Sequence, residues 1–333
     1  MAKIAIIGSG SWGTALAWLS QQNGHDVTLW SFLKEETEMF VKHHQNTDKL
    51  PGVILAEDTV YTSDLEEAVK EQDLLILAVP SPAVRATSKN MAPFIKEGQV
   101  IVDVAKGIEE STLMTMTDII EQEIPQADVA VLSGPSHAEE VGRGIPTTIV
   151  AGAHSRKTAE YIQSLFMSPS FRVYTSSDML GIEIGAALKN VIALAAGMAD
   201  GLGYGDNTEA ALITRGMAEL ARLGLAMGAN VNTLYGLSGI GDLIVTCGSK
   251  HSRNRRAGNL IGRGYNMQQA MDEVHMVVEG VYSAKAGKKL AEKYQIDMPI
   301  IQEVNKVLFE NKPAALAVNE LMLRHRKDEI ETW

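Results

Sequence analysis

Short apolar runs alternate with stretches of helical periodicity in the first half of the chain. The runs are rich in β-branched residues and are bounded by turn-forming residues, which is typical of strands buried on both faces. Segments between them, such as Thr14–Gln22, Leu65–Glu71 and Arg156–Phe166, are long enough for helices. The alternation predicts a parallel sheet covered by helices on both faces. The predicted strands are Lys3–Ile7, Val27–Trp30, Thr59–Thr62, Leu74–Val79, Val100–Ala105, Val129–Ser133, Thr147–Ala151 and Arg172–Thr175.

Beyond Asp178 the strand pattern disappears, and helical periodicity takes its place. We find no internal repeat and no low-complexity linker, so the change of period near residues 177–180 is the predicted domain boundary. The pattern predicts a doubly wound, Rossmann-like α/β domain over residues 1–178, with a mostly parallel sheet, and an all-α domain over residues 179–333. The predicted helices of the second domain are Ile184–Met198, Thr208–Met227, Met267–Glu273, Tyr282–Tyr294 and Ile300–Phe309.

Composition narrows the class of protein. Of the 333 residues, 45% are hydrophobic and 21% are charged, as in ordinary globular proteins, and the net charge of −11 argues against nucleic acid or anionic membranes as partners. Cys247 is the single cysteine, which excludes an intramolecular disulfide and favours a reducing compartment. The apolar run in residues 1–8 is too short for a signal peptide, and the apolar stretch Ala186–Ala199 is too short to span a bilayer. We therefore expect a cytoplasmic protein without stable membrane insertion.

A glycine-rich loop follows the first predicted strand directly. Residues 8–13 read Gly-Ser-Gly-Ser-Trp-Gly, and a helix is predicted from Thr14. In dinucleotide-binding folds Gly8 would permit the tight turn, Gly10 would let a pyrophosphate approach the backbone, and Gly13 would let helix and strand pack closely. A purely structural turn is the alternative. The strand before the loop and the helix after it favour dinucleotide binding.

The end of the second predicted strand does not decide between NAD and NADP. An acidic residue there would hold the 2′-hydroxyl of NAD, and an arginine would favour the 2′-phosphate of NADP. Neither occurs in Trp30-Ser31-Phe32-Leu33-Lys34. Ser31 and Lys34 could tolerate a phosphate, whereas Glu35 lies one position too late to assign. We therefore expect both NADH and NADPH to support a reaction.

Two loops at the carboxyl edge of the predicted sheet carry polar residues. Lys106 follows the fifth strand, at the edge where ligands of parallel sheets bind, although a solvated lysine before a turn glycine is the alternative. Residues 133–138, Ser-Gly-Pro-Ser-His-Ala, follow the sixth strand at the same edge. Within them His137 could act as an acid–base group, or it could be a helix cap or surface residue.

One lysine lies in a stripe of small residues on the first helix of the second domain. Close helix packing explains the small residues, but it does not explain Lys189 and Asn190 inside an apolar helix. A lysine in such surroundings can have its pKa lowered enough to exchange protons near neutrality. The stripe, at a spacing of four, consists of Gly181, Gly185, Lys189, Ala193 and Gly197.

A basic cluster further along the chain suggests a phosphate site. Residues 253–256, Arg-Asn-Arg-Arg, place three arginines in four positions of an acidic protein. Arginine forks match phosphate oxygens, with Ser252 and Asn254 adding neutral hydrogen bonds, although a solvated basic turn is the alternative. Upstream, Asp242 and Thr246 share one face if their segment is helical. A pocket for a small phosphorylated substrate is the simplest interpretation, and no metal site is predicted.

In combination these motifs resemble the bacterial NAD(P)-dependent sn-glycerol-3-phosphate dehydrogenases. The resemblance covers nearly the whole chain, and the order and spacing of the motifs make it highly specific. The matching segments are residues 6–16 (IIGSGSWGTAL), 105–107 (AKG), 133–136 (SGPS), 188–191 (LKNV), 212–216 (LITRG), 239–243 (GIGDL), 252–256 (SRNRR) and 278–280 (VEG).

This resemblance implies reduction of dihydroxyacetone phosphate to sn-glycerol 3-phosphate, a precursor of glycerophospholipids, with NADH or NADPH. Lys189 would exchange the proton with the substrate, Lys106 and Asp242 would orient and balance the site, and Thr246 would assist. The implied substrate positions are Lys106, Gly134, Ser136, Lys189, Asp242, Ser252, Arg253 and Asn254. The implied cofactor positions, beside the glycine loop, are Ser11, Trp12, Phe32, Lys106, Ala138, Arg253, Val277 and Glu279. The family often has a basic residue where this chain has Phe32, which weakens any transfer of NADP preference.

Two other functions fit the same residues less well. A related 3-hydroxyacid dehydrogenase would share the dinucleotide domain and the lysine–asparagine helix, but the arginine cluster favours a substrate that carries phosphate. A non-catalytic dinucleotide sensor would retain the fold, but it has no need of an embedded proton donor such as Lys189. The sequence leaves the oligomeric state open and allows a homodimer.

Overall fold

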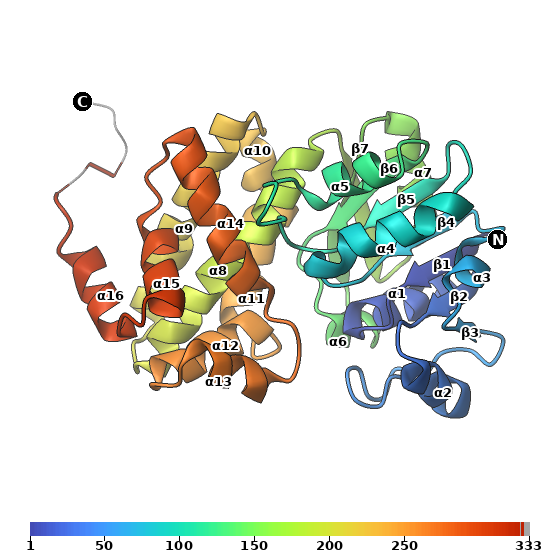
Figure 1. The fold of residues 1–333 in the computed structure, drawn as a ribbon, viewed down its shortest axis with the longest axis horizontal. Coiled ribbons are helices and arrows are strands. Elements are labelled where there is room, and N and C mark those ends of the chain that lie inside the picture. Colours follow the sequence, from blue (N-terminus) through green and yellow to red (C-terminus); the bar gives the residue numbers. More distant parts are fainter. Residues whose placement is uncertain (327, 330–333) are drawn as a thin grey trace.

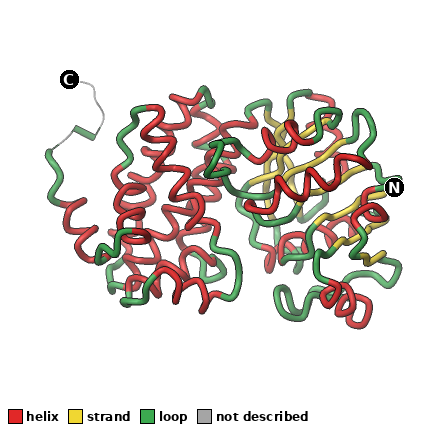
Figure 2. The backbone as a smooth tube through the Cα atoms, in the orientation of Figure 1, coloured by secondary structure: helices red, strands yellow, loops and turns green. Residues whose placement is uncertain are grey.

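The computed structural model describes residues 1–326, 328 and 329. It consists of an α/β half and a helical half that lie side by side, as Figure 1 shows. In Figure 2 all the strands lie in the first of these halves, and the other half consists of helices and loops. This arrangement confirms the predicted fold class, a Rossmann-like domain followed by a helical one.

The sheet contains eight strands, one for each predicted strand, in the order β3-β2-β1-β4-β5-β6-β7-β8. Every neighbouring pair is parallel except β6 and β7, which are antiparallel, so the sheet is mostly parallel as predicted. A parallel return needs a crossover connection, usually helical, whereas residues 134–146 contain only the short helix α6 (Ala138–Val141). The strands are β3 (Val60–Thr62), β2 (Asp26–Trp30), β1 (Lys3–Ile7), β4 (Leu74–Leu77), β5 (Val100–Asp103), β6 (Asp128–Ser133), β7 (Thr147–Ala153) and β8 (Phe171–Ser176).

Each face of the sheet has its own hydrophobic core. Alternate residues of β1 point to opposite faces, so Ile4 and Ile6 join the core beneath α1 and α7, while Ala5 and Ile7 join the core beneath α3, α4 and α5. Helix α1 begins at Ser11 and not at the predicted Thr14, so the N-terminal helical turn lies within the glycine motif. The helices are α1 (Ser11–Gln22), α2 (Lys34–His43), α3 (Leu65–Val69), α4 (Val84–Met91), α5 (Met116–Glu123), α6 (Ala138–Val141) and α7 (Arg156–Phe166), with 3-10 turns η1 (Ser81–Ala83) and η2 (Ala92–Phe94).

The helical half is built around the long helix α8, which begins two residues after Ser177 and extends further than the predicted Ile184–Met198. Within the described residues it is the one helix whose length and apolar composition would suffice to cross a membrane, but 94% of its most apolar window is buried inside the protein. The elements are α8 (Met179–Gly201), α9 (Asp206–Met227), α10 (Val231–Leu234), the π-helical turn η3 (Leu237–Gly241), α11 (Asp242–Gly248), α12 (Arg253–Gly262), α13 (Met267–Val274), α14 (Glu279–Tyr294), α15 (Pro299–Phe309) and α16 (Ala314–Met322).

Glycines bring α8 and α12 into backbone contact. A Cβ atom on Gly197 would lie 2.1 Å from the Arg255 carbonyl oxygen, and one on Gly258 would lie 2.2 Å from the Leu194 carbonyl oxygen. No larger side chain fits at either position without moving a helix. The packing interpretation of the small-residue stripe therefore holds at Gly197, and Lys189 is the polar exception within the stripe.

Candidate active site

A cavity of about 470 Å³ lies between the two halves of the protein. The glycine loop forms one part of its wall, and residues of α8, α11 and α12 form another. Gly13 and Gly134 do not line it. A Cβ atom on Gly13 would lie 1.9 Å from the Gly8 carbonyl oxygen, so this glycine serves close packing. The other predicted site residues do line it: Gly8, Gly10, Ser11, Trp12, Phe32, Lys106, Ser136, Ala138, Lys189, Asp242, Thr246, Ser252, Arg253, Asn254, Val277 and Glu279.

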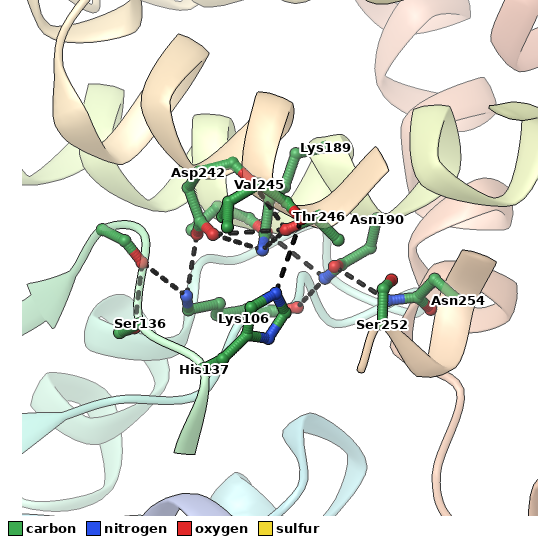
Figure 3. Close-up of polar contacts among 12 residues, drawn as sticks. Lys106, Ser136, His137, Lys189, Asn190, Asp242, Val245, Thr246, Ser252 and Asn254 are labelled. Atoms are coloured by element: carbon green, nitrogen blue, oxygen red, sulfur yellow. Dashed lines mark hydrogen bonds and ion pairs between the residues drawn. The ribbon is translucent and has the colours of Figure 1, made fainter. Parts of the chain in front are cut away.

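Two lysines from different halves of the protein share the carboxylate of Asp242 (Figure 3). Lys189 Nζ donates to Asp242 Oδ1 at 2.6 Å, and Lys106 Nζ donates to Asp242 Oδ2 at 2.7 Å. Lys189 Nζ also donates to Thr246 Oγ1 at 2.6 Å, and the Thr246 hydroxyl donates to the Asp242 carbonyl at 2.6 Å. Asp242 and Thr246 lie one turn apart on α11, which confirms that their segment is helical.

Burial and charge set the protonation of Lys189 and Asp242. Burial lowers the pKa of Lys189 to about 8, although the Asp242 carboxylate opposes that shift. Burial would by itself raise the pKa of Asp242, but Lys106 and Lys189 outweigh it and hold the pKa below its ordinary value. Asp242 is therefore ionised at neutral pH, and Lys189 can gain or lose a proton close to neutrality.

Lys106 is also held by the loop after β6. Its ammonium donates to the Gly134 carbonyl at 3.1 Å, and the Ser136 hydroxyl donates to the same oxygen at 2.9 Å. Gly134 has a φ of 152°, which a side chain rarely adopts, so glycine is needed to turn this carbonyl toward the lysine. Gly134 thus acts on the site through Lys106, and its carbonyl is engaged within the protein.

A chain of amides connects the lysine helix to α12 and α14. Asn190 donates to the Lys106 carbonyl at 3.2 Å and accepts from Asn254 Nδ2 at 2.9 Å. Asn254 Oδ1 in turn accepts from the Gly280 backbone N–H at 2.8 Å. A Cβ atom on Gly280 would lie 2.6 Å from the Asn190 carbonyl oxygen, which explains the glycine of the Val-Glu-Gly motif.

The arginine cluster is not a solvated turn, because its residues begin helix α12. Ser252 is the N-cap, and its hydroxyl accepts from the Arg255 backbone N–H. Helical spacing separates the three arginines: Arg253 and Arg256 line the cavity, while Arg255 pairs with Asp200 at 3.1 Å and does not line it. Two of the three guanidinium groups are therefore available to an anion in the cavity.

The cavity wall beside the glycine loop fits a dinucleotide. Helix α1 has no side-chain cap at Gly10, so its first backbone N–H groups are free to meet phosphates. A Cβ atom on Gly8, whose φ is 126°, would lie 2.5 Å from the Ala78 carbonyl oxygen, so the turn requires glycine. The Trp12 side chain also lines this wall, and its buried Nε1 has no hydrogen-bond partner among the described residues.

The structure adds Glu36, Lys49 and His251 to the site, which sequence reasoning missed, and it shows the surroundings of Glu279 and His137. Glu279 accepts from the Ser81 backbone N–H at 3.0 Å and from the Ser81 hydroxyl at 2.5 Å, which ties α14 to the turn after β4. Glu36 and Lys49 line the cavity near the glycine loop, and His137 lines it together with His251. The His137 side chain makes no capping bond, and burial lowers its pKa. No local motif marks Glu36, Lys49 or His251 as site residues, because segments far apart in the sequence bring them to the cavity.

Two further observations concern the cysteine and the side chains that could bind a metal ion. Cys247 follows Thr246 on α11 and is fully buried, and burial raises the pKa of its thiol to about 12. Among residues 1–326, 328 and 329, no three His, Cys, Asp or Glu side chains are grouped so as to hold a metal ion.

Comparison with known proteins assigns the family. Residues 3–159 match the model of the N-terminus of NAD-dependent glycerol-3-phosphate dehydrogenase, and residues 178–319 match that of its C-terminus. The chain belongs to this family. The Lys106–Asp242–Lys189 triad described above therefore lies within the fold of the NAD-dependent glycerol-3-phosphate dehydrogenases.

Individual glycerol-3-phosphate dehydrogenases resemble the chain along nearly its whole length. The NAD(P)+ enzyme of Agathobacter rectalis is 64% identical over 99% of this chain and 98% of its own, and that of Fusobacterium nucleatum is 61% identical over the full length of both. The crystal structure of the Coxiella burnetii enzyme has a TM-score of 0.94 and 34% identity, with coverage of 97% of this chain and 99% of its own.

Proposed function

We propose that this dehydrogenase reduces dihydroxyacetone phosphate to sn-glycerol 3-phosphate, reversibly, with NADH or NADPH. The observation that supports it most directly is a buried lysine able to exchange a proton near neutrality, in the same cavity as a glycine loop and two unpaired arginines. These are the three parts that such a reaction requires: a proton donor, a dinucleotide site and a phosphate site.

Lys189 is the proposed proton donor in reduction and the acceptor in oxidation. When bound, the nicotinamide supplies the hydride for the substrate carbonyl carbon. The Lys189 ammonium would protonate the carbonyl oxygen as negative charge develops on it. Two lysines and one carboxylate leave the triad with a net positive charge, which stabilises a developing alkoxide. Thr246 and Asp242 hold the Lys189 ammonium by hydrogen bonds of 2.6 Å and so fix its position.

The proposed phosphate site lies at the start of α12. Arg253 and Arg256 would pair with phosphate oxygens, and the Ser252 hydroxyl proton is not used by its capping bond, so it could donate to the same group. Binding the phosphate would fix the carbonyl against the cofactor, so that binding energy at a remote group lowers the barrier. Ser136 would act from the facing wall, and Lys106 would contact both ligands.

The proposed reaction also bears on the substrate class, the cellular compartment and the oligomeric state. The substrate class is a small phosphorylated ketone or alcohol, and we infer a cytoplasmic enzyme that supplies glycerophospholipid synthesis. A single cysteine, fully buried, suits a reducing compartment. A homodimer is compatible with the sequence, and the sedimentation coefficient of the purified protein would test it.

Oxidation of NADH or NADPH, followed by absorbance, should depend on dihydroxyacetone phosphate. Dihydroxyacetone without phosphate should be a much poorer substrate, because it cannot use the arginines of α12. If a 3-oxoacid is reduced as efficiently as dihydroxyacetone phosphate, the chain is a hydroxyacid dehydrogenase. Dinucleotide binding without turnover of any of these compounds would support a sensor.

Arg253→Lys keeps the positive charge but loses the bidentate fork. We expect the affinity for dihydroxyacetone phosphate to fall by about 1.5–3 kcal/mol, the value of a charged hydrogen bond, or roughly 10- to 150-fold. Arg255→Lys, which changes a residue outside the cavity, is the matched control and should leave substrate affinity unchanged. Equal effects of the two substitutions on KM would contradict the proposed phosphate site.

Lys189→Met preserves side-chain volume and removes the proton donor. Turnover should fall by at least about 100-fold, the lower range for loss of a general acid, while cofactor affinity persists. Lys157→Met, at an exposed lysine of α7, serves as the control for a general loss of charge. Near-normal turnover of a folded Lys189→Met variant would exclude this lysine as the proton donor.

The pH dependence should differ between the two directions of the reaction. Reduction needs protonated Lys189, so its kcat/KM should decline as pH rises through about 8, the pKa of that lysine. Oxidation needs the neutral amine, so its kcat/KM should rise through the same pH range. Profiles that slope in the same direction for both reactions would contradict the assignment.

A further inference from the structure

The Glu36 carboxylate lies in the cavity beside the glycine loop, although residues 30–34 at the end of β2 include no acidic residue. Glu36, in the first turn of α2, has one oxygen that accepts from the Ser9 hydroxyl at 2.5 Å and from the Ser31 hydroxyl at 3.0 Å. Its other oxygen pairs with Lys49. Ser9 belongs to the glycine loop and Ser31 directly follows β2, so Glu36 lies where these two segments meet.

The surrounding contacts hold this carboxylate in place. The Ser9 hydroxyl is also 2.8 Å from the Ser31 hydroxyl, so the three side chains form one cluster. Asn46 donates to the Ser9 carbonyl at 2.8 Å, and its own oxygen accepts from the Lys49 backbone N–H at 2.8 Å. The loop that carries Lys49 is therefore fixed to the glycine loop, and the Glu36–Lys49 ion pair is a fixed part of the cavity wall.

The carboxylate is ionised at neutral pH. Burial would raise the pKa of Glu36, but Lys49 and the hydroxyls of Ser9 and Ser31 outweigh it and hold the pKa below its ordinary value. The Glu36 side chain is only 17% exposed, against 34% for Lys49, so the charge is partly shielded from water and acts strongly on a neighbouring group.

In doubly wound folds, an acidic group at the end of the second strand accepts the ribose 2′-hydroxyl of NAD and repels the 2′-phosphate of NADP. We propose that Glu36 takes this role here and is the residue that makes the enzyme prefer NADH to NADPH. The inference rests on the proposed dinucleotide site. It changes the expectation drawn from residues 30–34 alone, in which neither cofactor had an advantage.

The nearby cations do not offset this effect. Lys49 is already paired with Glu36, and a 2′-phosphate could recruit it only by exposing the carboxylate to a second negative charge. Lys34 is exposed and does not line the cavity, and Phe32, 81% exposed, carries no charge. NADPH can therefore bind, but it has to do so against Glu36.

The test compares dissociation constants for NADH and NADPH in three proteins: the natural chain, Glu36→Gln and Glu35→Gln. Glu35 is the matched control because it is an exposed carboxylate in the same helical turn that does not line the cavity. For the natural chain we expect at least about 10-fold tighter binding of NADH, the lower value of one charged hydrogen bond. Glu36→Gln should shift that preference toward NADPH by at least about 10-fold, and Glu35→Gln should leave it unchanged.

Two results would overturn the assignment of Glu36. One is a natural chain that binds NADPH as tightly as NADH, a measurement that does not depend on any variant folding. The other is a folded Glu36→Gln protein, checked by circular dichroism, with the same preference as the natural chain. Turnover of dihydroxyacetone phosphate is measured in parallel, because a chain that binds NADH selectively without turnover would refute the proposed reaction and leave the role of Glu36 intact.

Discussion

A single buried carboxylate, Asp242, is the constraint on which the site depends. Two largely buried ammonium groups could not lie side by side without an anion between them. Asp242 is that anion, and because Lys106 belongs to the α/β half and Lys189 to the helical half, it joins the halves electrostatically. Burial lowers the pKa of Lys189 to about 8 in spite of its contact with Asp242, so proton exchange is possible in both directions near neutrality.

The helical packing makes this geometry rigid. Glycines let the α8 and α12 backbones touch, so the lysine helix and the arginine helix cannot slide independently. The amide chain from Asn190 through Asn254 to Gly280 adds α14 to the same unit. Backbone contacts and buried amides thus fix the proposed proton donor and the proposed phosphate site relative to each other. Their relative position does not depend on flexible surface loops.

Much of this architecture could be predicted from local patterns. Buried parallel strands are continuous apolar runs, so all eight strands were recognisable, and the charged Lys189 stood out in an apolar helix. The direction of β7 was not predictable in this way, because a strand buried on both faces has a continuous apolar pattern whether it is parallel or antiparallel. Glu36 escaped notice for a related reason: the bend between β2 and α2 brings it back to Ser9 and Ser31, and no spacing along the sequence records that bend.

The solitary thiol of Cys247 gives the protein an internal reporter. It lies fully buried on α11, directly after Thr246, and burial raises its pKa to about 12, so it is inert while the helical core is closed. A thiol reagent can reach it only when α11 separates from its neighbours. The labelling rate of the natural chain therefore measures how often the core opens beside Lys106 and Lys189, without any engineered probe. A change in that rate when a ligand is added would show how strongly the bound ligand restricts this opening.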